Sequence, residues 1–268
     1  MDVLDALILG IVEGVTEYLP VSSTGHLLVT QALLGIPADE AADAFAICIQ
    51  AGAILAVLLL YGRRVGRTLA GVAGRDAQGA RLALALLLAF LPAALLGGLY
   101  GWWFKQVFFG PWPIACAWIA GGLLILVLHR RGRPPAAGQP LEALTPRAAL
   151  LIGLAQCVAM IPGTSRSLVT ILAGLGTGLA VDAAVEFSFL LGVLTLTAAT
   201  AHEALDSGRA MLSEYGALPL LVGFATACVT AVVAVRWMVT WLRTRSLLVF
   251  AWWRLLAGAA LVAALLAG

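Results

Sequence analysis

The 268-residue chain is 62% hydrophobic and only 11% charged, with a formal net charge of +2. Soluble domains carry about 25% charged residues, so this composition excludes a soluble globular domain and indicates an integral membrane protein. The small net charge gives no reason to expect a nucleic-acid partner. The long aliphatic runs predict membrane helices rather than barrel strands, because barrel strands alternate in polarity.

The first notable element is a polar stretch, Glu13–His26, that lies between apolar runs at 3–12 and 27–34. Each run is too short to cross about 30 Å of hydrocarbon. Pro20 and Gly25 are expected to break the backbone, which predicts two short helices in a re-entrant hairpin. The turn of such a hairpin must be buried in protein or line a wet cavity, because lipid cannot satisfy its amides.

Six longer apolar runs predict transmembrane helices at 44–61, 82–100, 112–128, 183–201, 217–235 and 247–267. An acidic surface loop is expected before the first of them, at Asp39, Glu40 and Asp43. Between the third and fourth spans the hairpin pattern recurs: the polar segment 162–170 lies between two short apolar runs, 148–161 and 171–180.

Twelve of the sixteen Lys and Arg residues fall in three loops, at 63–81, 130–147 and 236–245. Cytoplasmic loops carry an excess of Lys and Arg, so these three loops are expected in the cytoplasm. Both termini and the remaining loops are then expected outside. The first hairpin would enter the membrane from the outside, and the second from the cytoplasm.

These features predict an all-α integral membrane protein with six transmembrane helices and two re-entrant helical hairpins in an inverted-topology repeat. The single membrane domain, 1–268, would consist of halves 1–128 and 147–268 joined by a cytoplasmic loop, 129–146. The hairpins also share a faint pattern, Pro20-x-Ser22 and Pro162-x-x-Ser165. Inverted repeats with broken helices place their site near the membrane midplane, so the two hairpin tips are expected to meet.

The tip of the second hairpin predicts a phosphate site. The Arg166 guanidinium offers a planar fork that suits phosphate, and the Gly163 turn exposes amides at the start of a helix, where anions bind. Hydroxyls surround it at Ser165, Ser167 and Thr170. The structural alternative is a helix break in which Arg166 pairs with a carboxylate. A charge at mid-bilayer costs about 2.5–3.5 kcal/mol, which favours the functional interpretation.

The tip of the first hairpin predicts acid–base or metal chemistry. Glu13 and Glu17 are four residues apart and share one helix face. Two such carboxylates repel unless a divalent cation or a shared proton intervenes; the structural alternative is that they balance Arg166. His26 lies beside the Ser23 hydroxyl, which indicates an acid–base or nucleophile partner rather than a structural imidazole.

The hydroxyls of Ser22 and Thr24 are further candidate phosphate ligands. Gln50 and Gln156 are polar positions within apolar segments and are expected to support the site from behind. Glu186 and Arg254 lie near span ends, where snorkelling to the interface or mutual pairing is the default expectation.

Two motifs resemble those of a known family, the undecaprenyl-diphosphate phosphatases or bacitracin-resistance proteins. They are Glu-Gly-Val-Thr-Glu-Tyr-Leu-Pro-Val-Ser-Ser-Thr-Gly-His at 13–26 and Pro-Gly-Thr-Ser-Arg-Ser at 162–167. The segments that begin at Gln50 and Glu186 are similar to further family segments. The chain departs from the family pattern at Leu168-Val169 and at 192–194, which lacks a proline; these departures bear on the fit beside the phosphate cradle.

The resemblance implies a multi-pass enzyme of the bacterial inner (plasma) membrane that hydrolyses undecaprenyl diphosphate to undecaprenyl phosphate and inorganic phosphate. It implies recycling of the lipid carrier of peptidoglycan and other envelope polymers, bacitracin resistance, and an active site open to the periplasm among membrane lipid. It also implies a divalent cation, Mg²⁺ or Ca²⁺, which the Glu13 and Glu17 carboxylates would hold. The resemblance leaves open whether the protein forms a homodimer.

Carried over by position, the resemblance makes Glu17 the essential acid, Glu13 its partner, and Arg166 the diphosphate-binding arginine. Ser23 and His26 match the catalytic hydroxyl and imidazole, and the nucleophile is left open among Ser23, His26 and water. The main alternative is a transporter or flippase for a phosphorylated polyprenyl lipid. A type 2 phosphatidic acid phosphatase fits poorly, because the next histidine after Ser165-Arg166 is His202, beyond a whole span.

Overall fold

The computed structural model describes residues 1–130 and 138–267, and within these ranges the regular structure is helical apart from one isolated bridge. The helices are α1 (Val3–Thr16), α2 (Ser23–Leu33), α3 (Glu40–Leu60), α4 (Gly62–Val72), α5 (Ala77–Phe108), α6 (Pro111–Arg130), η1 (Leu141–Ala143), α7 (Pro146–Gln156), η2 (Cys157–Met160), α8 (Arg166–Gly176), α9 (Val181–Asp206), α10 (Gly208–Tyr215), α11 (Ala217–Thr244) and α12 (Leu248–Ala267).

Six of the described helices are long and apolar enough to cross a membrane, namely α3, α5, α6, α9, α11 and α12. Each overlaps one of the six spans predicted from the sequence, which confirms that these six apolar segments are helices of membrane-spanning length. Large apolar side chains along α5, such as Leu84, Leu91 and Leu99, are exposed. In a membrane these side chains would face lipid, so their exposure fits a multi-pass membrane protein.

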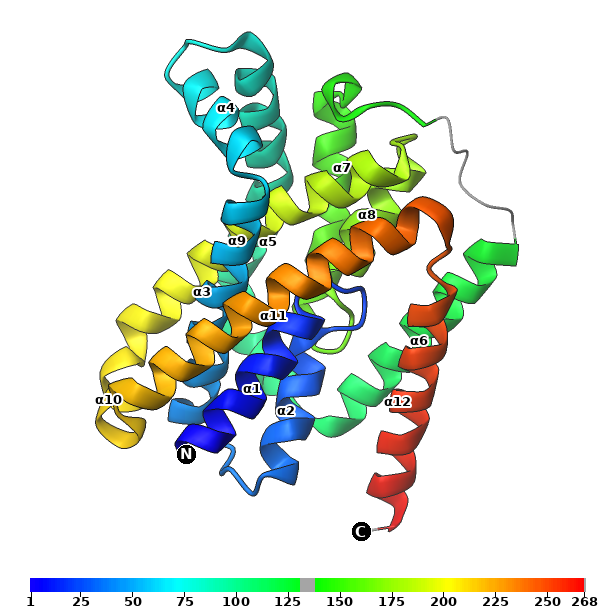
Figure 1. Ribbon diagram of the computed structural model, residues 1–268. Helices are drawn as coiled ribbons and strands as arrows, with labels where there is room; N and C mark the ends of the chain where they lie inside the picture. Colours follow the sequence, from blue (N-terminus) through cyan, green and yellow to red (C-terminus); the bar gives the residue numbers. More distant parts are fainter. Residues whose placement is uncertain (131–137, 268) are drawn as a thin grey trace.

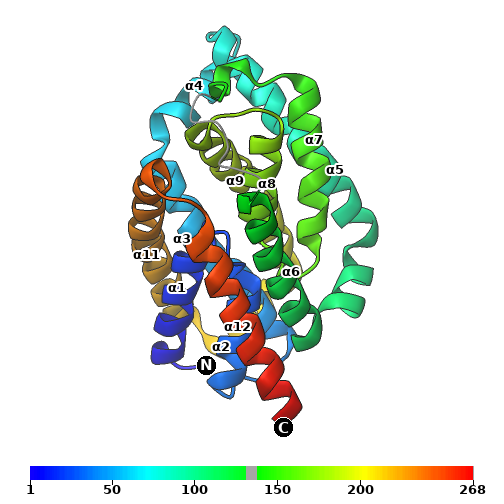
Figure 2. The same cartoon turned by 90° about the vertical axis from the view of Figure 1, so that its right-hand side faces the viewer.

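The long helices form a bundle with distinct ends. Both termini and α10 lie at one end, while α4 and the connection between α11 and α12 lie toward the other (Figure 1; Figure 2 shows the side view). The basic segments that the sequence assigns to one membrane side thus lie toward one end of the bundle. Of the joining loop predicted at 129–146, residues 131–137, including Arg131 and Arg133, lie outside the described residues.

Two short helical pairs enter the bundle from its ends. We call residues 17–22, between α1 and α2, the first turn, and residues 161–165, between η2 and α8, the second turn. Helix α1 packs mainly against α11, and α7 packs mainly against α5. Both contacts are close because of a glycine: a Cβ on Gly14 would lie 2.3 Å from the Ala227 carbonyl oxygen, and one on Gly153 would lie 2.5 Å from that of Ala89.

Apolar packing places the first turn and α8, which follows the second turn, in one core cluster. Tyr18 and Leu19 of the first turn belong to it together with Leu168 of α8 and Phe189 of α9. The Tyr18 and Phe189 rings meet edge to face with centroids 5.1 Å apart. The first turn and α8 are therefore held against α9 by buried apolar side chains, which fixes the position of the polar groups that they carry.

Three segments predicted as loops contain helix. The basic 63–81 segment forms α4 and the start of α5, the 202–216 segment forms α10, and the acidic loop is the start of α3. Asp39 caps α3 by accepting a hydrogen bond from the Ala42 amide at 2.8 Å. Acidic residues in the first helical turn are favoured by the helix dipole, so the charges that suggested a loop instead begin a helix.

The polar stretch at 13–26 is also more helical than predicted. Glu13 lies within α1, while Ser23 and His26 lie within α2, so only the first turn is irregular. Gly25 does not break the chain. A Cβ at Gly25 would lie 2.8 Å from the Trp118 ring, so glycine at this position allows α2 to approach α6 closely.

Candidate active site

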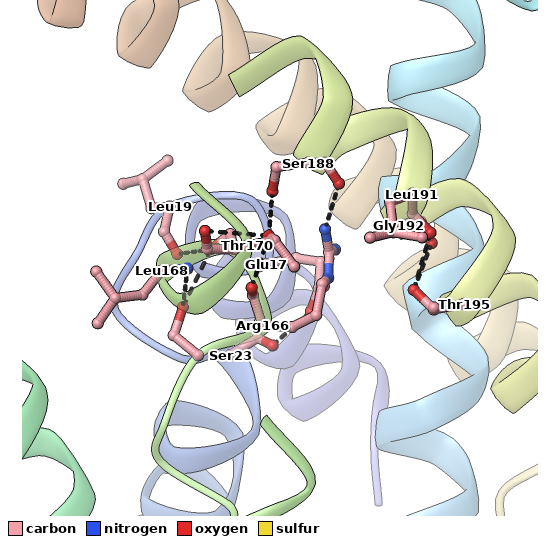
Figure 3. Close-up of polar contacts among 12 residues, drawn as sticks. Glu17, Leu19, Ser23, Arg166, Leu168, Thr170, Ser188, Leu191, Gly192 and Thr195 are labelled. Carbon is pink, nitrogen blue, oxygen red and sulfur yellow. Dashed lines mark hydrogen bonds and ion pairs between the residues drawn. The ribbon is translucent and has the colours of Figure 1, made fainter. Parts of the chain in front are cut away.

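The first turn is in direct contact with the start of α8, into which the second turn leads, at the centre of the molecule. Ser167, at the start of α8, donates its hydroxyl to the Leu19 carbonyl of the first turn at 2.9 Å. The Arg166 guanidinium pairs with the Glu17 carboxylate across the same boundary at 2.9 Å (Figure 3). The prediction that the two polar segments meet is therefore confirmed by contacts between residues about 150 positions apart in the chain.

Both turns end in the same unusual backbone conformation. Ser22 has φ 76° and ψ 101°, and Ser165 has φ 75° and ψ 110°. These are the two non-glycine residues with positive φ among the described residues. Such conformations cost about 1–3 kcal/mol and persist where surrounding structure holds them. Each serine immediately precedes a helix, so the turns present the amide ends of α2 and α8 to the same region.

A chain of three side chains connects the turns. The Ser23 hydroxyl donates to one carboxylate oxygen of Glu17 at 2.5 Å. The other Glu17 oxygen accepts from Arg166 Nη2 at 2.9 Å. A serine hydroxyl hydrogen-bonded to a carboxylate has a proton acceptor in place, which is the arrangement that activates a hydroxyl nucleophile. The hydrogen-bond partner of the Ser23 hydroxyl is thus Glu17 rather than His26.

The guanidinium of Arg166 is positioned from several sides. Its Nη1 donates to the Ser188 carbonyl of α9 at 2.9 Å, and its Cζ lies 5.4 Å from the centre of the Tyr18 ring. Gly192 leaves space for it, since a Cβ there would lie 2.3 Å from Nη1. Residues 192–194, which lack a proline, therefore lie where Arg166 approaches α9 closely. Its Nε is buried without a hydrogen-bond partner.

A cavity of about 250 Å³ opens beside this chain of side chains. The predicted site residues that line it are Glu17, Ser22, Ser23, Thr24, Gln50, Gly163, Ser165 and Arg166. Apolar side chains from α2, α3 and α9 complete the wall. A cavity lined by two carboxylates, Glu17 and Asp43, one guanidinium and several hydroxyls, with apolar surroundings, offers both polar and apolar surface to an amphiphilic ligand.

The remaining predicted residues lie behind the cavity or apart from it. Ser167 and Thr170 are buried, and the Thr170 hydroxyl contacts that of Ser188 at 2.7 Å. Gln156 donates to the Ala89 carbonyl of α5 at 3.4 Å. These groups hold α8 and α7 in place from outside the cavity lining, whereas Gln50 lies in the wall.

Glu13 is the most unusual charged group in the region. Its side chain is fully buried, and neither carboxylate oxygen has a hydrogen-bond partner. A buried carboxylate beside a second one is costly unless it is protonated or bound to a cation. The Glu13 oxygens are therefore suited to a divalent cation, whereas both Glu17 oxygens already have partners. The described residues contain no group of three or more acidic, His or Cys ligands, so such an ion would need further ligands from substrate or water.

The hydrogen-bond partners of the His26 ring are Trp253 and Ser22 rather than Glu17 or Ser23. Its Nε2 accepts the indole N–H of Trp253 at 2.9 Å, and its Nδ1 contacts the Ser22 carbonyl at 2.7 Å. An indole N–H can only donate, so Nδ1 carries the ring proton and donates to the carbonyl. Its ring packs against those of Trp118 and Trp253. Both nitrogens thus bind groups other than the Ser23 hydroxyl.

The sequence did not predict three contributors. Ser188 supplies a carbonyl to Arg166, and Asp43, expected on a surface loop, lines the cavity. Arg254 does not snorkel to the interface, because it is fully buried and contacts both turns. Glu186 pairs with Arg64 at 2.5 Å rather than with Arg254. The sequence around a long charged side chain on an apolar helix does not distinguish a buried side chain from one that snorkels to the interface.

Comparisons with known proteins match the chain over nearly its whole length. The family model described as bacitracin resistance protein BacA matches residues 6–260. Undecaprenyl-diphosphatase 2 of Rhodospirillum rubrum is 45% identical over 97% of this chain and 94% of its own length. Undecaprenyl-diphosphatase of Sorangium cellulosum is 44% identical over 95% of this chain and 84% of its own. Undecaprenyl-diphosphatase 1 of Chromobacterium violaceum is 45% identical over 94% and 93%.

Proposed function

The chain belongs to the bacitracin resistance protein BacA family, and we propose that it hydrolyses undecaprenyl diphosphate to undecaprenyl phosphate and inorganic phosphate. The proposal rests on the cross-turn contact of Arg166, Glu17 and Ser23 at the wall of the cavity. The names of its relatives, undecaprenyl-diphosphatases, support this choice of substrate. The activity would recycle the lipid carrier for peptidoglycan and other envelope polymers, and would confer bacitracin resistance.

The reacting groups are the Ser23 hydroxyl and the Glu17 carboxylate. Ser23 Oγ would form a bond to the terminal phosphorus while the bond from that phosphorus to the bridging oxygen breaks. Glu17 would take the hydroxyl proton, and undecaprenyl phosphate would leave. Water would then hydrolyse the phosphoserine and release phosphate. Because phosphoryl transfer depends mainly on positioning and charge neutralisation, the fixed Ser23–Glu17 contact is the central requirement.

The diphosphate would bind at the second turn. Arg166 supplies a permanent positive charge, and the start of α8 supplies amide groups near Gly163 and Ser165. Ser22 and Thr24 would contribute hydroxyls from the opposite wall. The prenyl chain would leave the cavity along its apolar lining and enter the surrounding lipid.

A divalent cation, Mg²⁺ or Ca²⁺, fits the unpartnered oxygens of Glu13. Glu13 would hold it, with Glu17 as a second ligand if one of its oxygens is released by Ser23 or Arg166. When bound, the ion would neutralise charge on the diphosphate. The same pairing would relieve the cost of burying Glu13 without a partner.

We further propose that the two helical pairs are re-entrant hairpins of an inverted repeat. Exchange of the halves 1–128 and 147–268 maps the α1–α11 contact onto the α7–α5 contact, and maps α3–α9 and α6–α12 onto themselves. The matching backbone of Ser22 and Ser165 supports the same pairing. The basic segments at the α4 end would face the cytoplasm, with the cavity open to the periplasm of the inner membrane. A homodimer is compatible with this arrangement.

The defining experiment is phosphate release from undecaprenyl diphosphate by purified protein in detergent, with and without chelator. We expect turnover by the wild type, loss with chelator, and a loss of at least about 10²-fold in Glu17→Gln and Ser23→Ala. Ser213→Ala is the matched control, because this hydroxyl is exposed on α10 and donates within its own helix to the Ala210 carbonyl. Normal turnover by Ser23→Ala would exclude Ser23 as the nucleophile.

A transporter or flippase for a phosphorylated polyprenyl lipid is the alternative. The correspondence between the helices of the two halves supports this alternative, because inverted repeats with broken helices are a transporter architecture. The same assay separates the two, because detergent solution has no gradient. Binding of the lipid without phosphate release would favour transport.

A further inference from the structure

Arg254 on α12 is fully buried, and its four hydrogen bonds all go to main-chain carbonyl oxygens. Two of them reach the turns: Nη1 donates to Pro20 at 3.3 Å, and Nη2 donates to Gly163 at 2.9 Å. The others reach α6: Nη2 donates to Ala117 at 2.8 Å, and Nε donates to Trp118 at 3.3 Å. One guanidinium therefore joins both turns to α6.

The two turn carbonyls lie next to the residues that carry the proposed chemistry. Pro20 precedes Ser22 and Ser23 by two and three positions, and Gly163 precedes Arg166 by three. Since both turns end in a positive-φ serine, their backbone needs external support to keep that conformation. Arg254 supplies this support to both turns at once, at carbonyls that irregular backbone leaves without a helical partner.

Arg254 is an expensive residue for a purely packing role. A buried cation loses its hydration, and apolar residues of similar volume often stabilise a core at least as well. Its planar fork of five donors can satisfy several carbonyls in fixed directions, which an ammonium group cannot do. The neighbouring Trp253 reinforces the same function, because its indole N–H holds His26 of α2.

We propose that Arg254 is a positioning residue that fixes the first and second turns relative to each other, so that Ser23, Glu17 and Arg166 meet. The catalytic part of this inference rests on the proposed function; the structural part does not. The hydrogen bonds of Arg254 go to main-chain carbonyls rather than to the Ser23, Glu17 or Arg166 side chains, and Arg254 does not itself line the cavity. Its effect would therefore pass through the backbone of the turns.

Gly121 offers a way to disturb Arg254 without removing its charge. A Cβ at Gly121 would lie 2.2 Å from Arg254 Nη2 and 2.6 Å from its Cζ. Gly121→Ala would therefore displace the guanidinium from its carbonyls. Gly98→Ala is the matched control, because a Cβ at that position of α5 would meet nothing within 4 Å.

The test is amide hydrogen exchange, read by mass spectrometry, on full-length wild type, Arg254→Lys, Arg254→Met, Gly121→Ala and Gly98→Ala, together with phosphate release from undecaprenyl diphosphate. In Arg254→Lys, Arg254→Met and Gly121→Ala we expect faster exchange at both turns and unchanged exchange in α3 and α9. Gly98→Ala should behave as wild type. We also expect kcat to fall about 10²-fold with little change in KM. Arg254→Lys should retain more activity than Arg254→Met.

Three outcomes are decisive. Unchanged exchange at the turns in Gly121→Ala and Arg254→Lys would overturn the proposal, whatever the activity. Faster exchange throughout the protein, with normal kcat in the folded fraction, would also overturn it and leave Arg254 a stabilising residue only. If wild type releases no phosphate but the turns loosen locally, the positioning of the turns stands and the proposed hydrolysis fails.

Discussion

The first and second turns share a backbone but carry opposite chemistry. Each ends in a serine at φ of about 75° that begins an 11-residue helix. Ser165 caps its own helix through its hydroxyl, which accepts from the Leu168 amide at 3.2 Å. Ser22 makes no such bond, and its carbonyl is held by His26 instead. The first turn thus keeps the Ser22 hydroxyl at the cavity without using it as a helix cap, whereas the second turn uses the Ser165 hydroxyl to cap α8.

The charges differ in the same way. The first helical pair contributes carboxylates, and the second contributes the guanidinium that neutralises one of them. An ion pair shared between the two helical pairs is formed only when both are folded against each other. The comparison therefore predicts that substitutions at either turn disable the same site, with effects graded by the contact that is lost.

Arg166→Ala is expected to have the largest effect. It removes the charge of the second turn and leaves Glu17 buried without its ion partner, so phosphate release should fall by about 10³-fold. Arg209→Ala, at an exposed position of α10, is the control and should behave as wild type. Near-normal turnover by Arg166→Ala in monodisperse protein would show that the second turn does not bind the diphosphate.

His26→Gln sharpens the role of the first turn. If His26 only holds Ser22 and Trp253, its loss should reduce turnover by about tenfold, and Trp253→Phe should cause a smaller loss of the same kind. A general acid or base usually contributes about 10²–10⁴-fold. A loss in that range for His26→Gln, with normal activity for Trp253→Phe, would restore His26 to a direct role in proton transfer.

Arg64→Met addresses a region far from both turns and should leave turnover unchanged. Arg64 contacts Glu186 at 2.5 Å and Glu142 at 2.7 Å, and its guanidinium holds the pKa of the Glu142 carboxyl below its usual value. Because the three side chains are partly exposed, the loss should be about 1 kcal/mol of unfolding free energy. A thermal shift assay checks this, and a fall in kcat would link the α4 end to the site.

Much of this arrangement could be predicted from the sequence. Long apolar runs define the six spans, because a segment inside lipid must satisfy its backbone hydrogen bonds internally and a helix does so. The polar segments around Glu17 and Arg166 are conspicuous because charges are rare in such surroundings. Their meeting followed from charge distribution along the loops, which orders the helices without any contact information.

Other features depend on tertiary packing and left no local signal. Gly25 looks like a helix break until Trp118 is seen against it. Arg254 looks like a snorkelling residue until the carbonyls of Pro20 and Gly163 are seen at its guanidinium. The sequence suggests that His26 acts on Ser23, but Trp253, from the far end of the chain, binds its Nε2.

The central claim, that the two turns form one site, is tested most directly by a double-mutant cycle on Glu17 and Arg166. Conservative variants, Glu17→Gln and Arg166→Lys, keep the double variant measurable by phosphate release. We expect each single variant to lose about 10²-fold in kcat/KM and the double variant to lose little more, because both changes break the same contact. Independent losses that multiply to about 10⁴-fold would show that the two turns act separately and would contradict a shared site.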